Sequence, residues 1–190
     1  TAVVVGRDTR ESGPALEQAI IDGCAAEGVT VHQMGVAPTP AIAFAAEHHQ
    51  WVAIAITASH NPWTDNGIKV FAAGGSKLSD SEQIDIERQW HALVAEPAPV
   101  ALGTVHDASH IVDEYVQHRL NTVGSAFAGM RIVLDCANGA MSSAAPALFA
   151  STDADVVVMN AEPNGRNIND KCGATSTAGL VARVIAEGAD

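Results

Sequence analysis

The stretch AVVVGRDTRESGPALEQAIIDGCAAEGVTVHQM, residues 2–34, decides the fold class of this chain. It opens on an apolar strand pattern at 2–5, continues as a helical pattern over about 12–27, and ends in a second strand pattern at 29–34. The predicted buried face of the helix consists of residues at i, i+3, i+4, i+7 and i+8: Leu16, Ala19, Ile20, Gly23 and Cys24. A strand, a helix and a strand in this order predict an α/β sheet with parallel strands.

The alternation continues along the rest of the chain. Further strands are predicted at 51–56, 68–71, 131–135 and 155–159, and further helices at about 40–49, 80–94, 108–122, 141–150 and 175–187. Ser12 and Thr39 are predicted helix N-caps, and Ser79 with Glu82 reads as a capping box. The pattern as a whole predicts three-layer α/β/α domains with mixed, mostly parallel sheets.

The length of 190 residues suits one large domain or two small ones. The segment Glu96-Pro97-Ala98-Pro99 interrupts a helical pattern and is the best linker candidate by composition. We expect a nearly complete first domain over 1–118 and a truncated second domain over 119–190, because the second series has only two strands. The chain starts directly before a strand and stops directly after a helix, so we expect a piece of a longer protein.

Composition excludes several functional classes. Lys and Arg total 10 against 22 Asp and Glu, and the formal net charge of −12 disfavours nucleic acid and anionic membrane surfaces as partners. The apolar runs are too short to span a bilayer, which takes about 20 residues. Cys24, Cys136 and Cys172 are odd in number and far apart, which indicates reduced cysteines and a cytoplasmic protein. The histidine pairs His106/His110 and His48/His49 are interpreted as solvated helix faces rather than metal ligands.

The segment TASHNPWTDNG, residues 57–67, is the most informative for chemistry. It follows an apolar strand, at the sheet edge where open α/β sheets bind ligands. Ser59 places a hydroxyl beside the imidazole of His60, and Lys69 adds a cation suited to a phosphate oxygen. The residues alone also allow a backbone-capping serine, a surface histidine and an exposed lysine. A serine hydrolase is disfavoured because no glycine flanks Ser59 and no acidic partner for His60 is evident.

Together with DNGIKVF at 65–71, this segment closely resembles the active-site serine loop of the α-D-phosphohexomutases. GRDTR at 6–10 and PTP at 38–40 are similar to the first domain of that family. Three further segments resemble its phosphoglucosamine mutase branch: GSKL at 75–78, DCANGA at 135–140 and NINDKCGAT at 167–175.

The resemblance implies an intramolecular phosphotransferase in which Ser59 is a phosphoserine. Such an enzyme interconverts glucosamine 6-phosphate and glucosamine 1-phosphate through a sugar 1,6-bisphosphate, which also acts as activator. The family holds Mg²⁺ through a phosphoserine oxygen, here that of Ser59, and three aspartates of a DGDGDR-like loop, which we expect beyond Asp190. By motif position, His60 and Lys69 would assist proton transfer and stabilise developing charge.

Arg7, Arg10 and Asn61 are the expected support for substrate and phosphate. For the two arginines, an ion pair with Asp8 or Glu11 is an equally weighted alternative. Asn167 and Asn169 are expected to shape an interdomain cleft rather than to contact substrate.

The resemblance also implies that further parts of the family's architecture are absent from these residues. We expect domains 3 and 4 of the same chain as partners and a possible homodimer, and we expect residues 1–190 alone to be inactive. A phosphomannomutase or phosphoglucomutase of the same family, or a non-catalytic binding module, remains an alternative.

Overall fold

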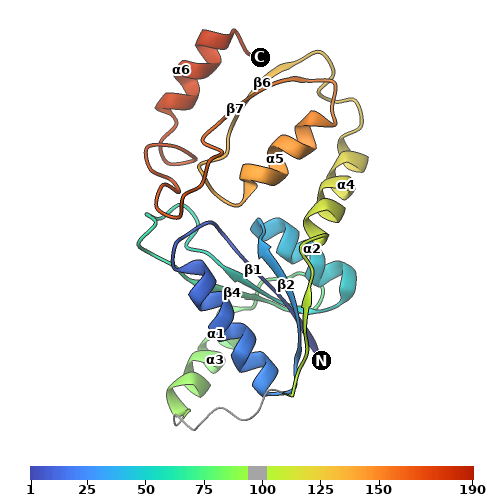
Figure 1. Ribbon diagram of the computed structural model, residues 1–190, viewed down its shortest axis with the longest axis vertical. Coiled ribbons are helices and arrows are strands. Elements are labelled where there is room, and N and C mark those ends of the chain that lie inside the picture. Colours follow the sequence, from blue (N-terminus) through green and yellow to red (C-terminus); the bar gives the residue numbers. More distant parts are fainter. Residues whose placement is uncertain (94–101) are drawn as a thin grey trace.

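The computed structural model describes residues 1–93 and 102–190. Its larger unit is built on a five-stranded sheet (Figure 1). The strands are β1 (Ala2–Arg7), β2 (Thr30–Val36), β3 (Val52–Ile56), β4 (Ile68–Phe71) and β5 (Val105–Asp107). Their spatial order is β4-β3-β1-β2-β5. All neighbours pair in parallel except β3 and β4, which form an antiparallel pair with Ala55 opposite Lys69.

Helices cover both faces of this sheet. Helix α1 (Gly13–Ala26) packs on one face through Ile21, against Val3, Val5, Val31 and Ile56. Helices α2 (Thr39–His49) and α4 (Ile111–Val123) pack on the other face, in a core that contains Val4, Met34, Ala53 and Phe71. Helix α3 (Asp80–Ala92) contains no buried residue and lies against the edge strand β4. None of the helices in the described residues is long and apolar enough to cross a membrane.

Close packing of α2 on the sheet fixes the position of its N-terminus. A Cβ atom at Gly6 would lie only 2.8 Å from Cδ1 of Ile42, so a larger residue at this position of β1 would push α2 away. The pairing of β1 with β2 also shifts register between Val5 and Gly6. As a result, the Pro38-Thr39-Pro40 segment lies beside the carboxyl end of β1, where the cavity described below opens.

The second unit is smaller. Strands β6 (Arg131–Asp135) and β7 (Asp155–Met159) form a parallel pair, and in Figure 1 they lie between α5 (Met141–Ala150) and α6 (Ala178–Glu187). Helix α4 joins the two units, because it packs against α2 and also contacts α5. The predicted boundary at 118/119 falls inside this helix, so the division of the chain there stays a prediction.

The three-layer, mostly parallel α/β architecture is confirmed, and several local predictions are corrected. The sequence pattern did not predict the short strand β5, which precedes the helix predicted at 108–122. That helix, α4, begins only at Ile111. His106 lies on β5 and His110 precedes α4, so the two histidines do not share a helix face. The predicted linker at 96–99 lies outside the described residues.

The helix-start predictions had mixed outcomes. Ser79 and Glu82 form the expected capping box. Ser12 caps nothing with its side chain and instead accepts a hydrogen bond from Asn66 Nδ2 at 2.9 Å. Pro38, not Thr39, is the N-cap of α2, because the proline already has the extended backbone of an N-cap while Thr39 is helical.

The buried face of α1 is shifted from the predicted one, although the predicted residues Leu16, Ile20 and Cys24 do pack, partly buried, against the core. Its buried residues are Gly13, Glu17, Ile21 and Ala25, whereas Ala19 and Gly23 are exposed. The reason is electrostatic, because the carboxylate of Glu17 lies under the helix and pairs with Arg7 Nε at 3.0 Å.

Aromatic rings stack at the amino edge of the sheet, opposite the ends that carry the cavity. The Trp51 indole lies between two imidazoles, with ring centroids 3.7 Å from His32 and 4.3 Å from His49. Burial, followed by the neighbouring His106 and the His49 charge, lowers the pKa of His32. Burial is also the largest cause that lowers the pKa of His49, with His48 and His110 adding to it and Glu114 opposing it. The His48/His49 pair is therefore not simply solvated as predicted, because His49 belongs to this stack.

This stack predicts acid sensitivity. A histidine whose folded-state pKa lies below its ordinary value, about 6.5, binds fewer protons in the folded state than in the unfolded state. Its stabilising contribution is therefore complete above about pH 6.5 and decreases as the pH falls toward the folded-state pKa. We expect denaturant titrations of the full-length protein between pH 7.5 and 5 to give a decreasing free energy of unfolding, and His32→Gln with His49→Gln to flatten this decrease. The control His91→Gln, on exposed α3, should leave the slope unchanged. An unaltered slope in the double variant would contradict the assignment.

Candidate functional site

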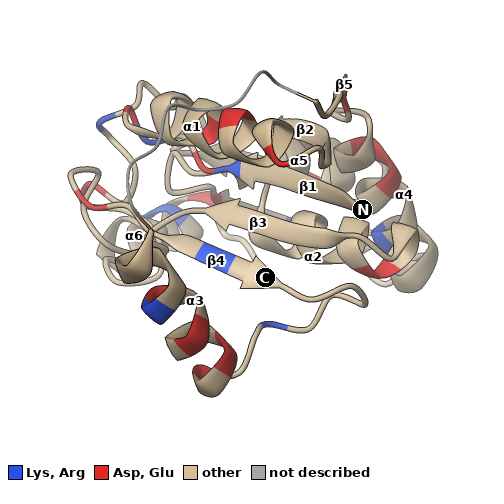
Figure 2. Ribbon diagram, turned by 90° about the horizontal axis from the view of Figure 1, so that it is seen from below, with Lys and Arg blue, Asp and Glu red and all other residues tan. Residues whose placement is uncertain are grey.

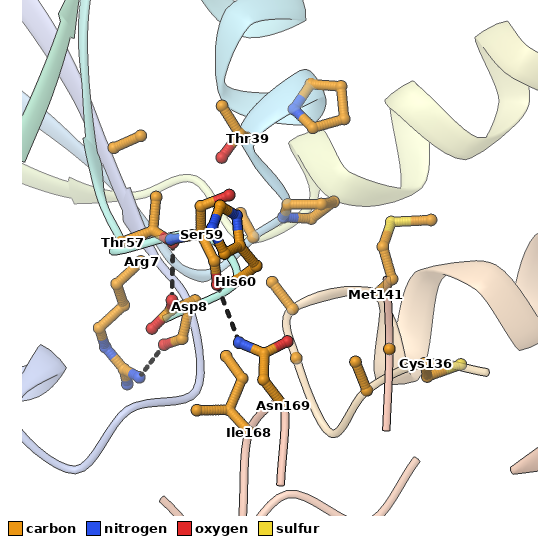
Figure 3. Close-up of a pocket in the computed structure, with 18 of the residues that line it drawn as sticks. Arg7, Asp8, Thr39, Thr57, Ser59, His60, Cys136, Met141, Ile168 and Asn169 are labelled. Carbon is orange, nitrogen blue, oxygen red and sulfur yellow. Dashed lines mark hydrogen bonds between the residues drawn. The ribbon is translucent and has the colours of Figure 1, made fainter. Parts of the chain in front are cut away.

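A cavity of about 370 Å³ opens between the two units, and the predicted residues Ser59 and His60 are among those that line it (Figure 3). From the first unit, the ends of β1 and β3 and the start of α2 line it. From the second unit, the loop between β6 and α5 and the segment around Asn169 complete it. The cavity thus lies at the carboxyl ends of parallel strands, where open α/β sheets place their ligands.

The loop at 57–67 is closed at its base and folded by local hydrogen bonds. The Thr57 N–H donates to the Gly67 carbonyl at 2.9 Å, which joins the ends of β3 and β4. The Ser59 N–H donates to Thr57 Oγ1 at 2.9 Å, and that hydroxyl donates to Asp8 Oδ2 at 2.7 Å. Ser59 itself has a φ of 56°, in the left-handed region that L-residues rarely adopt. The loop is therefore held in one defined, strained conformation.

The buried side chain of Arg10 supports this loop by hydrogen bonds to its backbone. Its side chain is 0% exposed, and Nε pairs with Asp8 Oδ2 at 2.9 Å. The four remaining N–H groups donate to loop carbonyls: Nη1 to Pro62 and to Asp65 at 2.9 Å, and Nη2 to Ser59 and to Asn61 at 3.0 Å each. All five guanidinium donors are thus satisfied. The geometry favours the ion-pair alternative for Arg10 and makes it a support of the loop backbone rather than a ligand of phosphate.

Ser59 and His60 lie on the cavity side of the loop (Figure 3). Both residues are exposed, and no described residue forms a hydrogen bond with the Ser59 hydroxyl. Helix α2 begins at Thr39 and α5 at Met141, and both residues line the same cavity. Helix N-termini carry partial positive charge and free N–H groups, so the site favours an anion near Ser59.

The other predicted site residues are placed differently. Arg7 lines the cavity, but its Nε pairs with Glu17 and its Nη1 donates to the Asp8 carbonyl at 3.3 Å. Asn61 donates through Nδ2 to Asp65 Oδ2 at 3.0 Å, within the loop. Lys69 is on the edge strand β4, the blue segment in Figure 2, and lines a separate cavity of about 310 Å³ between β4 and α3. The structure therefore brings Ser59, His60 and Arg7 together and leaves Lys69 outside the cavity lining.

Residues of the second unit contact the loop directly. Asn169 Nδ2 donates to the Ser59 carbonyl at 2.9 Å and to the Asn61 carbonyl at 3.1 Å. Asn167 does not reach the loop and bonds instead within its own segment, to Glu162 and Asn164. The expectation that these asparagines shape an interdomain cleft fits the position of Asn169 in the cavity wall.

Sequence reasoning missed part of the site. Thr57 and Asp8 form the hydrogen-bonded chain to Ser59, but Thr57 was not singled out and Asp8 was considered only as an ion-pair partner of the arginines. A signal was available for both: Thr57 stands two residues before Ser59, the spacing of a hydroxyl-to-backbone turn, and Asp8 stands two residues before Arg10. The contact of Asn169 had no such signal, because 110 positions separate it from Ser59.

The cysteines are poor candidates for nucleophiles, although Cys136 is one of the residues that line the cavity. All three are free, and Cys136 and Cys172 are buried. Burial raises the pKa of both thiols, and the nearby Asp135 carboxylate adds to the effect. Thiols with raised pKa values are poor nucleophiles at neutral pH, which favours a packing role for these two residues.

The fold and cavity define an α/β protein that presents a serine hydroxyl in an anion-favouring cleft. The family model described as "Phosphoglucomutase/phosphomannomutase, alpha/beta/alpha domain I" matches residues 1–95. The chain therefore belongs to the phosphoglucomutase/phosphomannomutase family.

The chain is also similar to individual proteins of this family. The chain is 46% identical to a phosphoglucosamine mutase of Salinispora tropica, over 98% of this chain and 42% of that protein. It is 48% identical to one of Frankia casuarinae, over 99% of this chain and 42% of that protein. Among solved structures, a phosphoglucomutase/phosphomannomutase family protein of Burkholderia thailandensis superimposes with a TM-score of 0.82 at 28% identity, covering 100% of this chain and 43% of that chain. The chain thus spans about 42% of the length of the curated relatives it matches.

Proposed function

We propose that this chain carries the phosphoserine loop of a phosphoglucosamine mutase, an intramolecular phosphotransferase that interconverts glucosamine 6-phosphate and glucosamine 1-phosphate. The observation that carries the proposal is the position of Ser59, whose exposed hydroxyl stands on a braced loop in a cavity bordered by two helix N-termini. The names of the relatives support the choice of sugar. Because the chain spans less than half of their length, the proposal concerns the full-length protein.

The proposed reaction has two transfers. Phosphorylated Ser59 gives its phosphoryl group to the 1-hydroxyl of glucosamine 6-phosphate: the serine O–P bond breaks, the sugar O–P bond forms at O1, and the hydroxyl proton passes through a base to the serine oxygen. The resulting 1,6-bisphosphate then reorients in the cavity. The sugar O–P bond at O6 breaks, the serine O–P bond forms again, the serine proton passes to O6, and glucosamine 1-phosphate is released. A phosphoserine carries about −1.5 to −2 charge at neutral pH, which the N-termini of α2 and α5 would partly offset.

The residues around Ser59 would have different roles in phosphoryl transfer. His60 lines the cavity beside Ser59 and is the better-placed candidate for moving the proton. Arg7 would present its guanidinium at the cavity wall, with its charge partly offset by Glu17, whereas Arg10 and Asn61 would hold the loop. Lys69 would stabilise developing charge only if its ammonium reached across the edge of the sheet toward Ser59.

The proposed enzyme uses Mg²⁺, but the described residues do not form a complete site for the ion. No group of three or more His, Cys, Asp or Glu side chains in the part of the chain that the structure describes could hold a metal ion. A phosphoryl oxygen on Ser59 would supply one hard ligand of the kind Mg²⁺ prefers, and the carboxylates would have to come from other residues.

Assembly and location stay predictions. Unpaired cysteines persist in reducing compartments, so we propose a cytoplasmic enzyme. A homodimer is compatible with this proposal and is tested by sedimentation of the full-length protein.

The test compares substrates. We expect the full-length protein, with Mg²⁺ and a trace of sugar 1,6-bisphosphate, to convert glucosamine 6-phosphate with a higher kcat/KM than glucose or mannose 6-phosphate. A clear preference for mannose or glucose would assign the protein to the other branch named in its family. No turnover of any of the three, with no phosphoryl group on Ser59, would favour a non-catalytic binding module.

A further inference from the structure

The backbone of Ser59 is fixed by partners from both units. Its φ of 56° is unfavourable for a residue with a side chain, so the conformation depends on its surroundings. The N–H is held by Thr57 Oγ1 at 2.9 Å. The carbonyl accepts from Arg10 Nη2 at 3.0 Å and from Asn169 Nδ2 at 2.9 Å. Two of these partners belong to the first unit, and Asn169 belongs to the second.

Asn169 uses one amide group to bind two backbone carbonyls of the loop. Its second hydrogen bond runs from Nδ2 to the Asn61 carbonyl at 3.1 Å, so both amide N–H groups are directed at the loop backbone. Its own backbone is also left-handed, with a φ of 59°, and its N–H donates to the Ala137 carbonyl at 3.0 Å. The side chain is therefore presented to the loop by a backbone that is itself anchored in the second unit.

Further contacts dock the same segment onto the first unit. Arg166 forms a two-pronged ion pair with Glu11, with N to O distances of 2.7 to 3.0 Å. The Glu11 N–H donates to the Gly165 carbonyl at 2.9 Å, and Thr9 Oγ1 donates to the Asn138 carbonyl at 2.6 Å. These contacts set the distance between the units independently of Asn169. Removing the Asn169 amide should therefore free the Ser59 carbonyl without separating the units.

We propose that Asn169 is a positioning residue for phosphoryl transfer, through which the second unit fixes the backbone of the reactive serine in the first. The proposal rests on the proposed function. By holding the Ser59 carbonyl, Asn169 keeps the left-handed peptide that presents the Ser59 hydroxyl to the cavity (Figure 3). It touches neither the transferred group nor the proton, so its contribution is to the alignment of the reacting oxygen. Alignment errors of about 1 Å can cost about 100-fold in rate.

The test uses two variants of the full-length protein. Asn169→Ala removes the amide, and Asn169→Asp keeps the size of the side chain but replaces both donors by an acceptor facing two carbonyls. We expect both to lower kcat for glucosamine 6-phosphate about 10- to 100-fold with little change in KM. We expect an unchanged melting temperature for Asn169→Asp, because the docking contacts of Glu11 and Arg166 remain and aspartate, like asparagine, tolerates the φ of 59°. We expect Asn169→Ala to melt slightly lower, because alanine adopts this left-handed backbone less readily. The control Asn121→Ala makes the same change at an exposed position of α4 and should behave as wild type.

The outcomes separate this inference from the proposed function. A wild-type protein without turnover and without phosphorylated Ser59 refutes the proposed function. A wild-type protein that turns over, beside an Asn169→Ala variant with equal kcat, overturns only the role of Asn169. A raised KM at constant kcat, or an equal loss in Asn121→Ala, also overturns it. If Asn169→Ala melts at a lower temperature, the isosteric Asn169→Asp decides, and a wild-type kcat in that variant refutes the role.

Discussion

Replacing Ser59 by alanine is expected to abolish phosphoryl incorporation and mutase turnover in the full-length protein while leaving the fold intact. The loop is braced through the backbone of Ser59, namely its N–H to Thr57 and its carbonyl to Arg10 and Asn169, and alanine preserves all three hydrogen bonds. Only the hydroxyl, the proposed carrier of the phosphoryl group, is lost. Loss of a covalent nucleophile typically costs at least about 10⁴-fold in kcat, so the residual rate should be near background.

Intact and peptide mass spectrometry measure this effect. Wild-type protein incubated with a sugar 1,6-bisphosphate should gain one phosphoryl mass on the peptide that contains Ser59, and Ser59→Ala should gain none. Ser76→Ala, in an exposed turn before α3, is the matched control and should be phosphorylated and active. Turnover retained in Ser59→Ala, or a phosphoryl group found at another residue, would show that Ser59 has been given the wrong role.

The part of the site that the sequence could predict is the part encoded by consecutive residues. An apolar strand followed by a long polar loop placed Ser59 and His60 at the carboxyl edge of the sheet, and both line the cavity there. The loop could be recognised because its chemistry is contained in a few residues and because strand order follows from strand and helix alternation. The same reasoning expected Lys69 nearby, yet antiparallel pairing with β3 puts it opposite Ala55 on an edge strand.

The features that the sequence could not predict depend mostly on contacts between residues that are distant in the sequence. Hydrophobic periodicity wrongly placed Ala19 and Gly23 on the buried face of α1. It treats every carboxylate as solvated, so it could not predict that Glu17 is buried and paired with Arg7. Strand β5 has three residues, and all three are exposed, so no hydrophobic pattern marks it. The bridge from Asn169 to Ser59 exists only once two α/β units are docked.

Arg10→Met is expected to be the most destabilising of the changes considered. Methionine fills a similar volume without donors, so the Asp8 carboxylate, which is itself buried, loses its charged partner. The carbonyls of Ser59, Asn61, Pro62 and Asp65 lose hydrogen bonds at the same time. Removing one partner of a buried ion pair typically costs about 3–5 kcal/mol, and we expect a loss of this size in the free energy of unfolding.

A conservative change separates charge from geometry at this position. Arg10→Lys retains the positive charge beside Asp8, but an ammonium has three donors on one atom and cannot span an acid and four carbonyls. We therefore expect it to recover part of the stability and little of the phosphorylation of Ser59. The control is Arg88→Met, the same substitution in an exposed ion pair between Arg88 and Asp85 on α3. Exposed ion pairs contribute little to the free energy of unfolding.

Denaturant titration of the full-length protein, monitored at its first unfolding transition, measures these differences. The expected order of stability is wild type and Arg88→Met together, then Arg10→Lys, then Arg10→Met. If Arg10→Met unfolded together with Arg88→Met, the five hydrogen bonds of Arg10 would not support the loop. If Arg10→Lys were fully phosphorylated at Ser59, charge alone would suffice, and the fixed fork of the guanidinium would not be what holds the serine in its left-handed conformation.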